Sequence, residues 1–244
     1  MHERQIALDG GSNMRDLGGW ALPDGRRMRA GWMFRAASLS ALSAVDHGRL
    51  RALSLATVID LRSSGEQRDS PSRLPRGLTV IAPGDPGTTM HPGLARNRRP
   101  HTEAEAVDMM RLGYESYPDR MAPALAAVFE AAAHSEGRPL LFHCAAGKDR
   151  TGFVAAIVLK AFGADGDQVM ADYLATNTMW DRKSSRMSFL PAPAQEAILQ
   201  ARAEYLTTAI DTVMSRYGAV DAYLTDRCLV SRDVLEAARQ AAIR

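Results

Sequence analysis

The sequence contains little cysteine, little lysine and no excess of charge of either sign. Two cysteines among 244 residues, Cys144 and Cys228, exclude a disulfide-rich scaffold. Basic and acidic residues number 30 and 28, and this balance argues against a protein that coats nucleic acid. Only three of the 30 basic residues are lysines. We interpret most of the excess of arginine over lysine as a bias in overall composition. The alternative is that some of these arginines bind phosphate, because a guanidinium group suits phosphate better than an ammonium group does.

Long apolar segments are also missing. Residues 1–6 lack the apolar region of a signal peptide, and the longest strongly apolar run, 153–159, is far shorter than a membrane span. We therefore expect a soluble protein without an integral membrane segment, located in the cytoplasm. Export by a route without a cleaved signal stays open, and no feature of the sequence indicates an oligomeric state.

Short apolar segments alternate with helical patterns along most of the chain. Buried strands are predicted at 56–61, 78–82 and 139–143, and helices at 42–53, 120–134, 151–162, 168–177, 194–217, 220–224 and 231–243. The helix at 42–53 is expected to have an apolar stripe formed by Leu42, Val45, Leu50 and Leu53. This order predicts an α/β fold with a largely parallel sheet flanked by helices and a helical part over about 165–244. No shift in composition divides the chain, so we expect residues 1–244 to form a single domain. Residues 83–101 are predicted to form a surface loop that carries Arg96, Arg98 and Arg99.

The loop after the 139–143 strand has the residues of a phosphate cradle. Cys144 follows the strand, small residues turn the chain, and an apolar helix begins near Thr151. Such a loop points backbone N–H groups inward at the positive end of a helix dipole, which favours both a bound dianion and a thiolate. Arg150, six residues after Cys144, can clamp phosphate oxygens. The predicted phosphate-binding loop is 143–151, with phosphate contacts from Ala145, Ala146, Gly147, Lys148, Asp149 and Arg150.

This segment resembles the signature His-Cys-x-x-Gly-Lys-Asp-Arg-Thr-Gly of the bacterial tyrosine-phosphatase-like family, within the cysteine-dependent phosphatases. The resemblance continues at residues 13–19, Asn-Met-Arg-Asp-Leu-Gly-Gly, and at 58–63, Val-Ile-Asp-Leu-Arg-Ser, with Glu66. It covers about residues 8 to 240, with Met14 where an aromatic residue is usual and Ala36 where a serine is usual. It implies a cysteine-phosphatase-like fold and hydrolysis of phosphomonoesters, most of all phosphotyrosine in proteins, with dual-specificity or phosphoinositide activity as a further expectation.

The resemblance implies a cysteinyl-phosphate intermediate in which Cys144 is the nucleophile and Arg150, with the loop amides, holds the phosphoryl oxygens. Thr151 is expected to donate a hydrogen bond to the departing sulfur, to cap the helix, or both. His143 is expected to order the loop and help keep the thiol ionised, or simply to pack in the strand.

The general acid is less clearly indicated, because no tryptophan in the sequence is followed by Pro-Asp. The family is thought to use the aspartate inside the loop, here Asp149, and a neighbouring phosphate dianion would raise the pKa of its carboxyl group. Asp85 is the rival donor. The alternative role for Asp149 is a fixed anion that pairs with Arg15, Arg35 or Arg62.

Three further residues are predicted near the phosphate. Lys148 adds a second cation that would suit a multiply phosphorylated head group, unless it is a solvated surface lysine. Asp60 and Arg62 lie at a strand end, where they bind substrate or, as we expect, brace the loop.

No cofactor is expected, and no metal, since the six histidines show no ligand spacing. The expected partner is a phosphorylated protein or a phosphoinositide, not nucleic acid. A sulfurtransferase and a non-catalytic phosphate-binding module are the alternatives.

Overall fold

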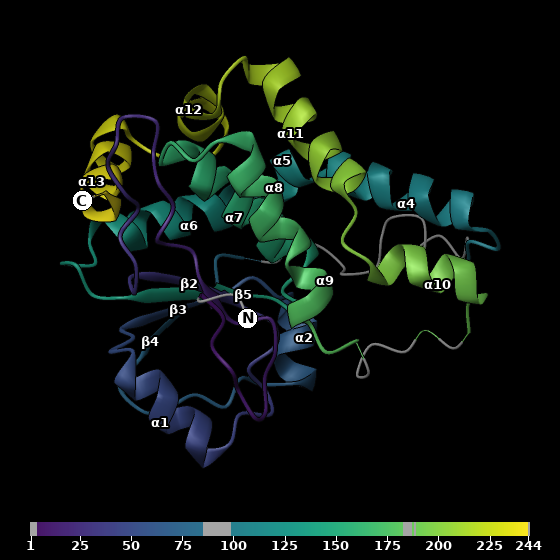
Figure 1. The fold of residues 1–244 in the computed structure, drawn as a ribbon, viewed down its shortest axis with the longest axis horizontal. Helices are drawn as coiled ribbons and strands as arrows, with labels where there is room; N and C mark the ends of the chain where they lie inside the picture. Colours follow the sequence, from purple (N-terminus) through teal and green to yellow (C-terminus); the bar gives the residue numbers. More distant parts are fainter. Residues whose placement is uncertain (1–3, 85–98, 183–186, 188, 244) are drawn as a thin grey trace.

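A five-stranded sheet lies at the centre of the fold (Figure 1). The computed structural model describes residues 4–84, 99–182, 187 and 189–243. The strand order is β1-β2-β5-β3-β4, and β1 alone runs antiparallel to its neighbour. The strands are β1 (Arg15–Asp16), β2 (Met33–Ala36), β3 (Thr57–Asp60), β4 (Thr79–Ile81) and β5 (Leu140–His143). The predicted α/β fold with a largely parallel sheet is confirmed.

The carboxyl ends of the three inner strands line up. Ala36 at the end of β2 and Asp60 at the end of β3 both pair in register with His143 at the end of β5. In open α/β sheets, ligands bind beyond the carboxyl ends of the strands. The residues that follow β5 and β3 in the sequence therefore meet at one edge of the sheet.

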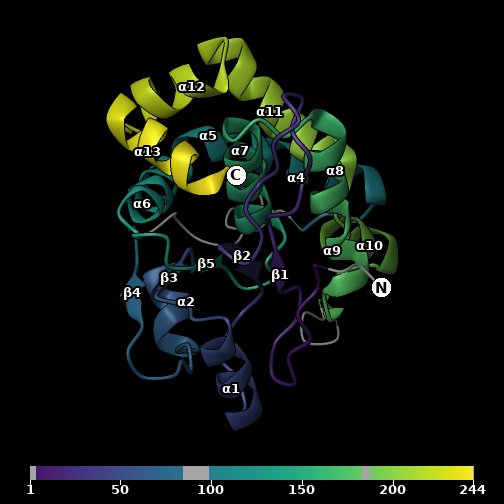
Figure 2. The ribbon, with the colours of Figure 1, turned by 60° about the vertical axis from the view of Figure 1, so that its left-hand side comes forward.

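Helices cover both faces of the sheet, and Figure 2 shows α1 and α2 on one side and most of the others on the opposite side. Helix α7 is the most deeply placed, since every residue from Arg150 to Leu159 is buried. The predicted helical C-terminal part is confirmed. The helices are α1 (Ala44–Ala52), α2 (Ser64–Asp69), α4 (Glu103–Glu115), α5 (Tyr117–Arg120), α6 (Ala122–Ala133), α7 (Asp149–Ala161), α8 (Gly166–Leu174), α9 (Thr176–Met179), α10 (Ala192–Leu199), α11 (Ala203–Tyr217), α12 (Val220–Ala222), a π-helical turn (Tyr223–Arg227) and α13 (Arg232–Ala242).

Two predictions of burial are wrong. The strand at 78–82 forms, as β4, but it has one neighbour and Val80 is 55% exposed. An edge strand has a neighbour along one side only, so its side chains meet water more readily than those of β5. In the helix predicted at 42–53, Leu50 is buried but Val45 is 57% exposed.

The predicted helix at 194–217 is two helices, α10 and α11, separated by a break around Gln200. Neither glycine nor proline marks the break. Instead, the side chain of Asn177 bonds both the backbone N–H and the carbonyl of Ala201, and Lys148 donates to the carbonyl of Gln200. These tertiary hydrogen bonds replace the intrahelical ones, so the interruption is not visible in the local sequence pattern.

The elements that were not expected from the sequence include β1, β2 and the two helices α2 and α4. The two helices each begin with a capping box, Ser63 with Glu66 in α2 and Thr102 with Glu105 in α4. The spacing Ser/Thr-x-x-Glu is a recognised signal for a helix start, so both helices were predictable.

Most of the predicted 83–101 loop, including Asp85, Arg96 and Arg98, lies outside the described residues. Arg99 is described, and its guanidinium carbon lies 5.3 Å from the ring centroid of Phe189. Within the described ranges, every helix is too short or too polar to cross a lipid bilayer.

Candidate active site

The loop from Cys144 to Lys148 connects β5 to α7 and turns sharply at Gly147. Gly147 has a φ of +65°, and a Cβ atom there would lie 2.5 Å from the Ala36 carbonyl oxygen. Only glycine meets both requirements. Helix α7 begins at Asp149, and its N-cap residue, Lys148, makes no side-chain capping bond. The first-turn amides of α7 thus have no acceptor from a cap and are suited to an anion.

The backbone of this loop is held from outside by two residues of the N-terminal segment. Asn13 donates from Nδ2 to the carbonyls of Ala146 and Gly147, at 3.0 and 2.9 Å. Arg35, at the edge of β2, donates to the Gly147 carbonyl at 2.6 Å. These bonds point the loop carbonyls away from the cleft, which leaves the opposite side of each peptide, the N–H side, for a ligand.

Arg35 is itself fixed by a buried ion cluster. The carboxylate of Asp172 accepts from Arg15 at 2.9 Å and from Arg35 at 2.6 Å, and all three side chains are almost completely buried. Burial opposes ionisation of Asp172, but the two guanidinium groups outweigh it and lower the pKa of the carboxyl group to about 2. Asp172 therefore carries a charge at neutral pH and holds both arginines in place.

Arg150 faces the cleft with its guanidinium group held by Glu66. Two hydrogen bonds join them, Nη1 to Oε2 at 2.8 Å and Nη2 to Oε1 at 2.9 Å, and Nη1 also donates to the Leu61 carbonyl at 3.2 Å. Burial opposes ionisation of Glu66, yet the bonds from Arg150 hold its pKa below the usual value. No role was predicted for Glu66 from the sequence. The signal that could have drawn attention to it is its place in the capping box with Ser63.

Asp60 and Arg62 form a brace beside the loop. Arg62 donates to both carboxylate oxygens of Asp60, at 2.9 and 2.7 Å, and to the Ser70 carbonyl and the Ser72 hydroxyl. Arg62 is 2% exposed, so its guanidinium group is engaged within the protein. This arrangement agrees with bracing rather than with a free cation for substrate.

His143 is the last residue of β5 and directly precedes Cys144. Its Nε2 atom is 3.6 Å from the Asp60 carboxylate, and its Nδ1 atom is 3.2 Å from the Cys144 carbonyl oxygen. Burial lowers the pKa of His143 to about 4, although Asp60 opposes the shift. The ring is neutral at neutral pH, so it orders the loop by hydrogen bonding and supplies no positive charge to a thiolate.

Lys148 is buried rather than solvated, since it is 2% exposed. Its ammonium group donates to the carbonyls of Ile198 and Gln200 and lies 3.3 Å from the Asp149 carboxylate. Burial lowers the pKa of Lys148, and Asp149 opposes this shift. The lysine thus lines the cleft and connects the loop to the carboxyl end of α10.

Asp149 does not pair with any of the three arginines considered from the sequence. Its Oδ1 atom accepts from the Tyr114 hydroxyl at 2.7 Å and lies near Lys148, while its side chain is 27% exposed. Tyr114 belongs to α4, which was not predicted, so this contact was not accessible from the sequence.

Thr151 is the third residue of α7 and does not cap the helix. Its Oγ1 atom is buried and has no hydrogen-bond partner in the described part of the chain. A buried hydroxyl without a partner is costly, and a group on a bound substrate or a charged sulfur would satisfy it.

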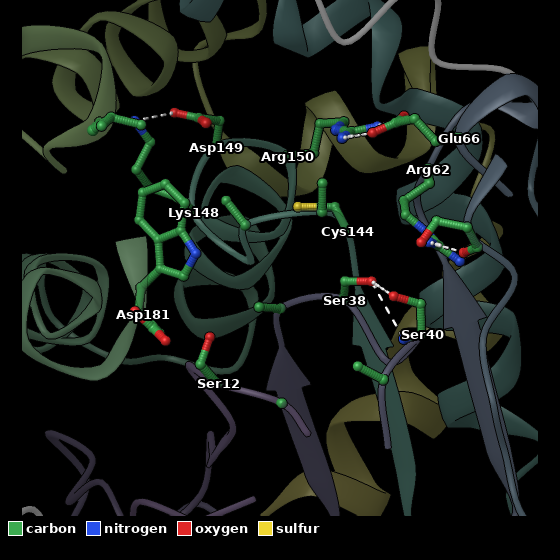
Figure 3. Close-up of a pocket in the computed structure, with 18 of the residues that line it drawn as sticks. Ser12, Ser38, Ser40, Arg62, Glu66, Cys144, Lys148, Asp149, Arg150 and Asp181 are labelled. Carbon is green, nitrogen blue, oxygen red and sulfur yellow. Dashed lines mark hydrogen bonds and ion pairs between the residues drawn. The ribbon is translucent and has the colours of Figure 1, made fainter. Parts of the chain in front are cut away.

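Cys144 lies on the floor of a cleft of about 760 Å³ and is 2% exposed. Figure 3 shows it with the Lys148–Asp149 pair to one side and the Arg150–Glu66 pair to the other. The lining also includes the apolar residues Tyr117, Trp180, Met187, Ile198 and Leu199. The cleft therefore joins a polar floor, in which Lys148 and Arg150 are each paired with a carboxylate, to an apolar wall.

Comparison with known proteins agrees with this geometry. Residues 6–243 match the tyrosine phosphatase family. The chain belongs to that family. A protein of Cupriavidus necator named for tyrosine-protein phosphatase activity is 38% identical over 230 residues, covering 91% of this chain and 83% of its own. The triple specificity protein phosphatase PtpB of Mycobacterium tuberculosis is 33% identical, covering 90% of this chain and 92% of its own.

A solved structure of TpbA from P. aeruginosa covers 80% of this chain and 96% of its own, with 15% identity and a TM-score of 0.32. The family resemblance inferred from the loop motif is confirmed by the family match. The predicted activity, that of a cysteine-dependent tyrosine phosphatase, is confirmed with it.

Proposed function

We propose that this tyrosine phosphatase hydrolyses phosphotyrosine in proteins and that Cys144, Asp149, Arg150 and Thr151 carry out the reaction. One observation carries the proposal: the Cys144 thiol lies at the N-terminus of α7 beside an Arg150 guanidinium group that Glu66 holds in place. The helix dipole and the guanidinium group favour both the thiolate and the charge that develops on the transferring phosphoryl group.

In the first step, the Cys144 thiolate attacks phosphorus, the S–P bond forms, and the P–O bond to the tyrosine oxygen breaks. Arg150 and the amides from Ala145 onward hold the equatorial oxygens as their charge is redistributed. Asp149 gives its proton to the departing oxygen, so tyrosine leaves as a neutral phenol. Its position at the cleft wall, partly exposed and close to the loop, supports this role.

In the second step, water attacks phosphorus and the S–P bond breaks. Asp149, now a carboxylate, takes a proton from the water. The sulfur departs as a thiolate, and the unpartnered Thr151 hydroxyl is available to donate a hydrogen bond to it. His143 keeps the Cys144 carbonyl in place through both steps.

The shape of the cleft supports phosphotyrosine as the main substrate. The Cys144 thiol is buried on the floor of the cleft, and Trp180 and Tyr117 offer an apolar wall for an aromatic ring. Lys148 gives little support for phosphoinositides, because two carbonyls and Asp149 already engage its ammonium group. The M. tuberculosis relative is named for triple specificity, so all three substrate classes belong in the test.

The decisive experiment measures hydrolysis of 4-nitrophenyl phosphate and of phosphotyrosine, phosphoserine and phosphoinositide substrates, with and without EDTA. We expect Cys144→Ser to lose turnover and the wild type to be unaffected by EDTA. Cys228→Ser is the matched control, since burial raises the pKa of the Cys228 thiol to about 12 and makes it unreactive. Equal activity of wild type and Cys144→Ser would refute the covalent mechanism.

The wild type and Cys144→Ser also distinguish the phosphatase from two other functions. A sulfurtransferase would transfer sulfur from thiosulfate to cyanide at Cys144 and would release no phosphate. A non-catalytic module would bind phosphate in both wild type and Cys144→Ser without turnover. The free Thr151 hydroxyl and the Arg150–Glu66 pair favour the phosphatase, because phosphoryl transfer uses both groups.

We also infer that the chain acts as one phosphatase domain in the cytoplasm. The family match along residues 6–243 supports the single domain, and a reactive Cys144 must stay reduced. Cell fractionation checks the location, and recovery of the activity in an exported fraction would contradict it.

A further inference from the structure

A chain of hydroxyl groups reaches Asp149 from the helical layer. The Tyr114 hydroxyl donates to Asp149 Oδ1 at 2.7 Å, and the Tyr173 hydroxyl lies 2.7 Å from that of Tyr114. A phenolic hydroxyl has one proton, and Tyr114 uses it on Asp149. Tyr173 must therefore be the donor to Tyr114, and the bonds run in one direction from α8 through α4 to the start of α7.

The surrounding packing fixes the Tyr114 ring. Its centroid lies 4.8 Å from that of Tyr117, 6.3 Å from that of Tyr173 and 5.7 Å from that of Tyr205, and Tyr114 is fully buried. Tyr173 is in turn packed closely on α7, where a Cβ atom at Gly152 would lie 2.9 Å from its ring. The hydroxyl oxygen cannot move away from Asp149 without displacing several buried rings.

The donors on Asp149 are concentrated on one oxygen. Both the Tyr114 hydroxyl and the Lys148 ammonium group are directed to Oδ1, at 2.7 and 3.3 Å. A protonated carboxyl group has one O–H, and the oxygen that accepts from two donors is the poorer place for it. The proton is thereby directed to Oδ2.

We propose that Tyr114 is a positioning residue for the general acid: its hydroxyl occupies Asp149 Oδ1, so that Oδ2 carries the proton that is given to the substrate. The proposal rests on the role of Asp149 proposed above. As the P–O bond breaks, its electron pair stays on the phenolic oxygen, which takes the proton from Oδ2. In the second step, the water that attacks phosphorus returns a proton to the same oxygen, while Tyr114 remains bonded to Oδ1 throughout.

The groups around Asp149 keep Tyr114 protonated. Its neighbours are Lys148 in the loop, Cys144 and Arg150 in the cleft, and the hydroxyl groups of Tyr114, Tyr117, Tyr173 and Tyr205. Burial first, and the Asp149 charge second, raise the pKa of Tyr114 and of Tyr173 well above the ordinary value. Tyr114 thus stays protonated and remains a donor over the working pH range. Its removal takes away the hydrogen bond that Asp149 Oδ1 accepts.

The test compares two leaving groups. Phenyl phosphate needs a proton on its departing oxygen, whereas 2,4-dinitrophenyl phosphate does not. We expect Tyr114→Phe to lower kcat for phenyl phosphate by roughly 10-fold, since a hydrogen bond to a charged group is lost, and to leave kcat for the dinitrophenyl ester nearly unchanged.

Tyr205→Phe is the matched control. Tyr205 packs against the same ring, but its hydroxyl donates to the Ala197 carbonyl at 3.0 Å. We expect the ratio of the two rates to be unchanged in this variant. Tyr173→Phe removes the donor behind Tyr114 and should change the ratio in the same direction by a smaller factor. It also provides a second measurement if Tyr114→Phe is poorly folded.

Asp149→Asn separates the possible failures. In one outcome, Asp149→Asn lowers kcat for phenyl phosphate selectively, while Tyr114→Phe and Tyr173→Phe lower kcat for both esters equally or for neither. The positioning role of Tyr114 is then wrong, and Asp149 remains the general acid. If Asp149→Asn itself shows no dependence on the leaving group, the acid assignment fails and the role of Tyr114 fails with it. Selective loss in both Asp149→Asn and Tyr114→Phe supports the proposal.

Discussion

Glu66 holds both terminal nitrogens of Arg150, at 2.8 and 2.9 Å, so the guanidinium group that we propose to clamp phosphate is already oriented within the protein. The same carboxylate accepts from the backbone N–H of Ser63 at 2.8 Å and completes the capping box of α2. One side chain thus joins the start of a short helix to the clamp. This arrangement avoids the loss of side-chain entropy that an unrestrained arginine would incur on binding phosphate.

Glu66→Gln should separate the two functions of this carboxylate. Glutamine also serves in a capping box, so α2 should persist, but the charge on Arg150 loses its partner. We expect kcat/KM for 4-nitrophenyl phosphate to fall by roughly 10-fold, as for loss of a hydrogen bond between charged groups. Glu105→Gln makes the same change in the capping box of α4 and should leave the activity unchanged. Equal rates for Glu66→Gln and wild type would show that Arg150 needs no anchor.

Gly147→Ala should abolish phosphate binding at the loop. The positive φ of Gly147 is unfavourable for alanine, and the added Cβ would lie 2.5 Å from the Ala36 carbonyl oxygen. The loop must shift, and its amides would no longer converge on one phosphate. Gly48→Ala is the control, because Gly48 lies in α1 with open space around it and should gain about 0.5–1 kcal/mol of stability. Calorimetric titration with inorganic phosphate measures the difference, and normal binding by Gly147→Ala would contradict it.

Asp172→Asn should destabilise the fold as well as the loop. The substitution leaves Arg15 and Arg35 buried without a counter-charge, which costs about 3–5 kcal/mol in comparable buried pairs. Asp221→Asn removes a surface pair with Arg239 and should change the free energy of unfolding by less than about 1 kcal/mol. Urea denaturation of the two variants checks the contrast. Similar decreases in the free energy of unfolding would mean that the buried cluster stabilises the fold no more than an ordinary surface ion pair does.

The strand, turn and helix around the proposed phosphate-binding loop were predictable because they are local: Cys144, Gly147 and Arg150 are neighbours in the sequence, and a strand and a helix flank them. The residues that hold the loop are distant in the sequence. Asp172 meets Arg35 across 137 positions, and Glu66 meets Arg150 across 84. A pattern of spacings carries no information about such contacts, since they depend on how α2 and α8 pack around the sheet.

Lys148 illustrates the same limit. Its place in the loop motif suggested a cation for substrate, but the break between α10 and α11 brings two carbonyls to its ammonium group. That break arises from tertiary hydrogen bonds around Ala201, and a helical pattern read from the sequence continues through it. Neither interpretation of Lys148 drawn from the sequence, a second cation near the phosphate or a solvated side chain, included its hydrogen bonds to these two carbonyls.

The stability of the protein should decrease as the pH falls from about 6.5 to about 4, in part because of His143. Burial lowers the folded-state pKa of His143 to about 4, against about 6.5 in an unfolded chain, so within this window the unfolded state binds more protons. Stability therefore rises with pH through the window, and His143 contributes a change on the order of 3 kcal/mol to it. His143→Gln, which cannot titrate, should show a flatter profile over the same range. His134→Gln is the control, because His134 is exposed. Urea denaturation between pH 4 and pH 7 measures the three profiles, and parallel curves for wild type and His143→Gln would show that His143 is not the titrating group.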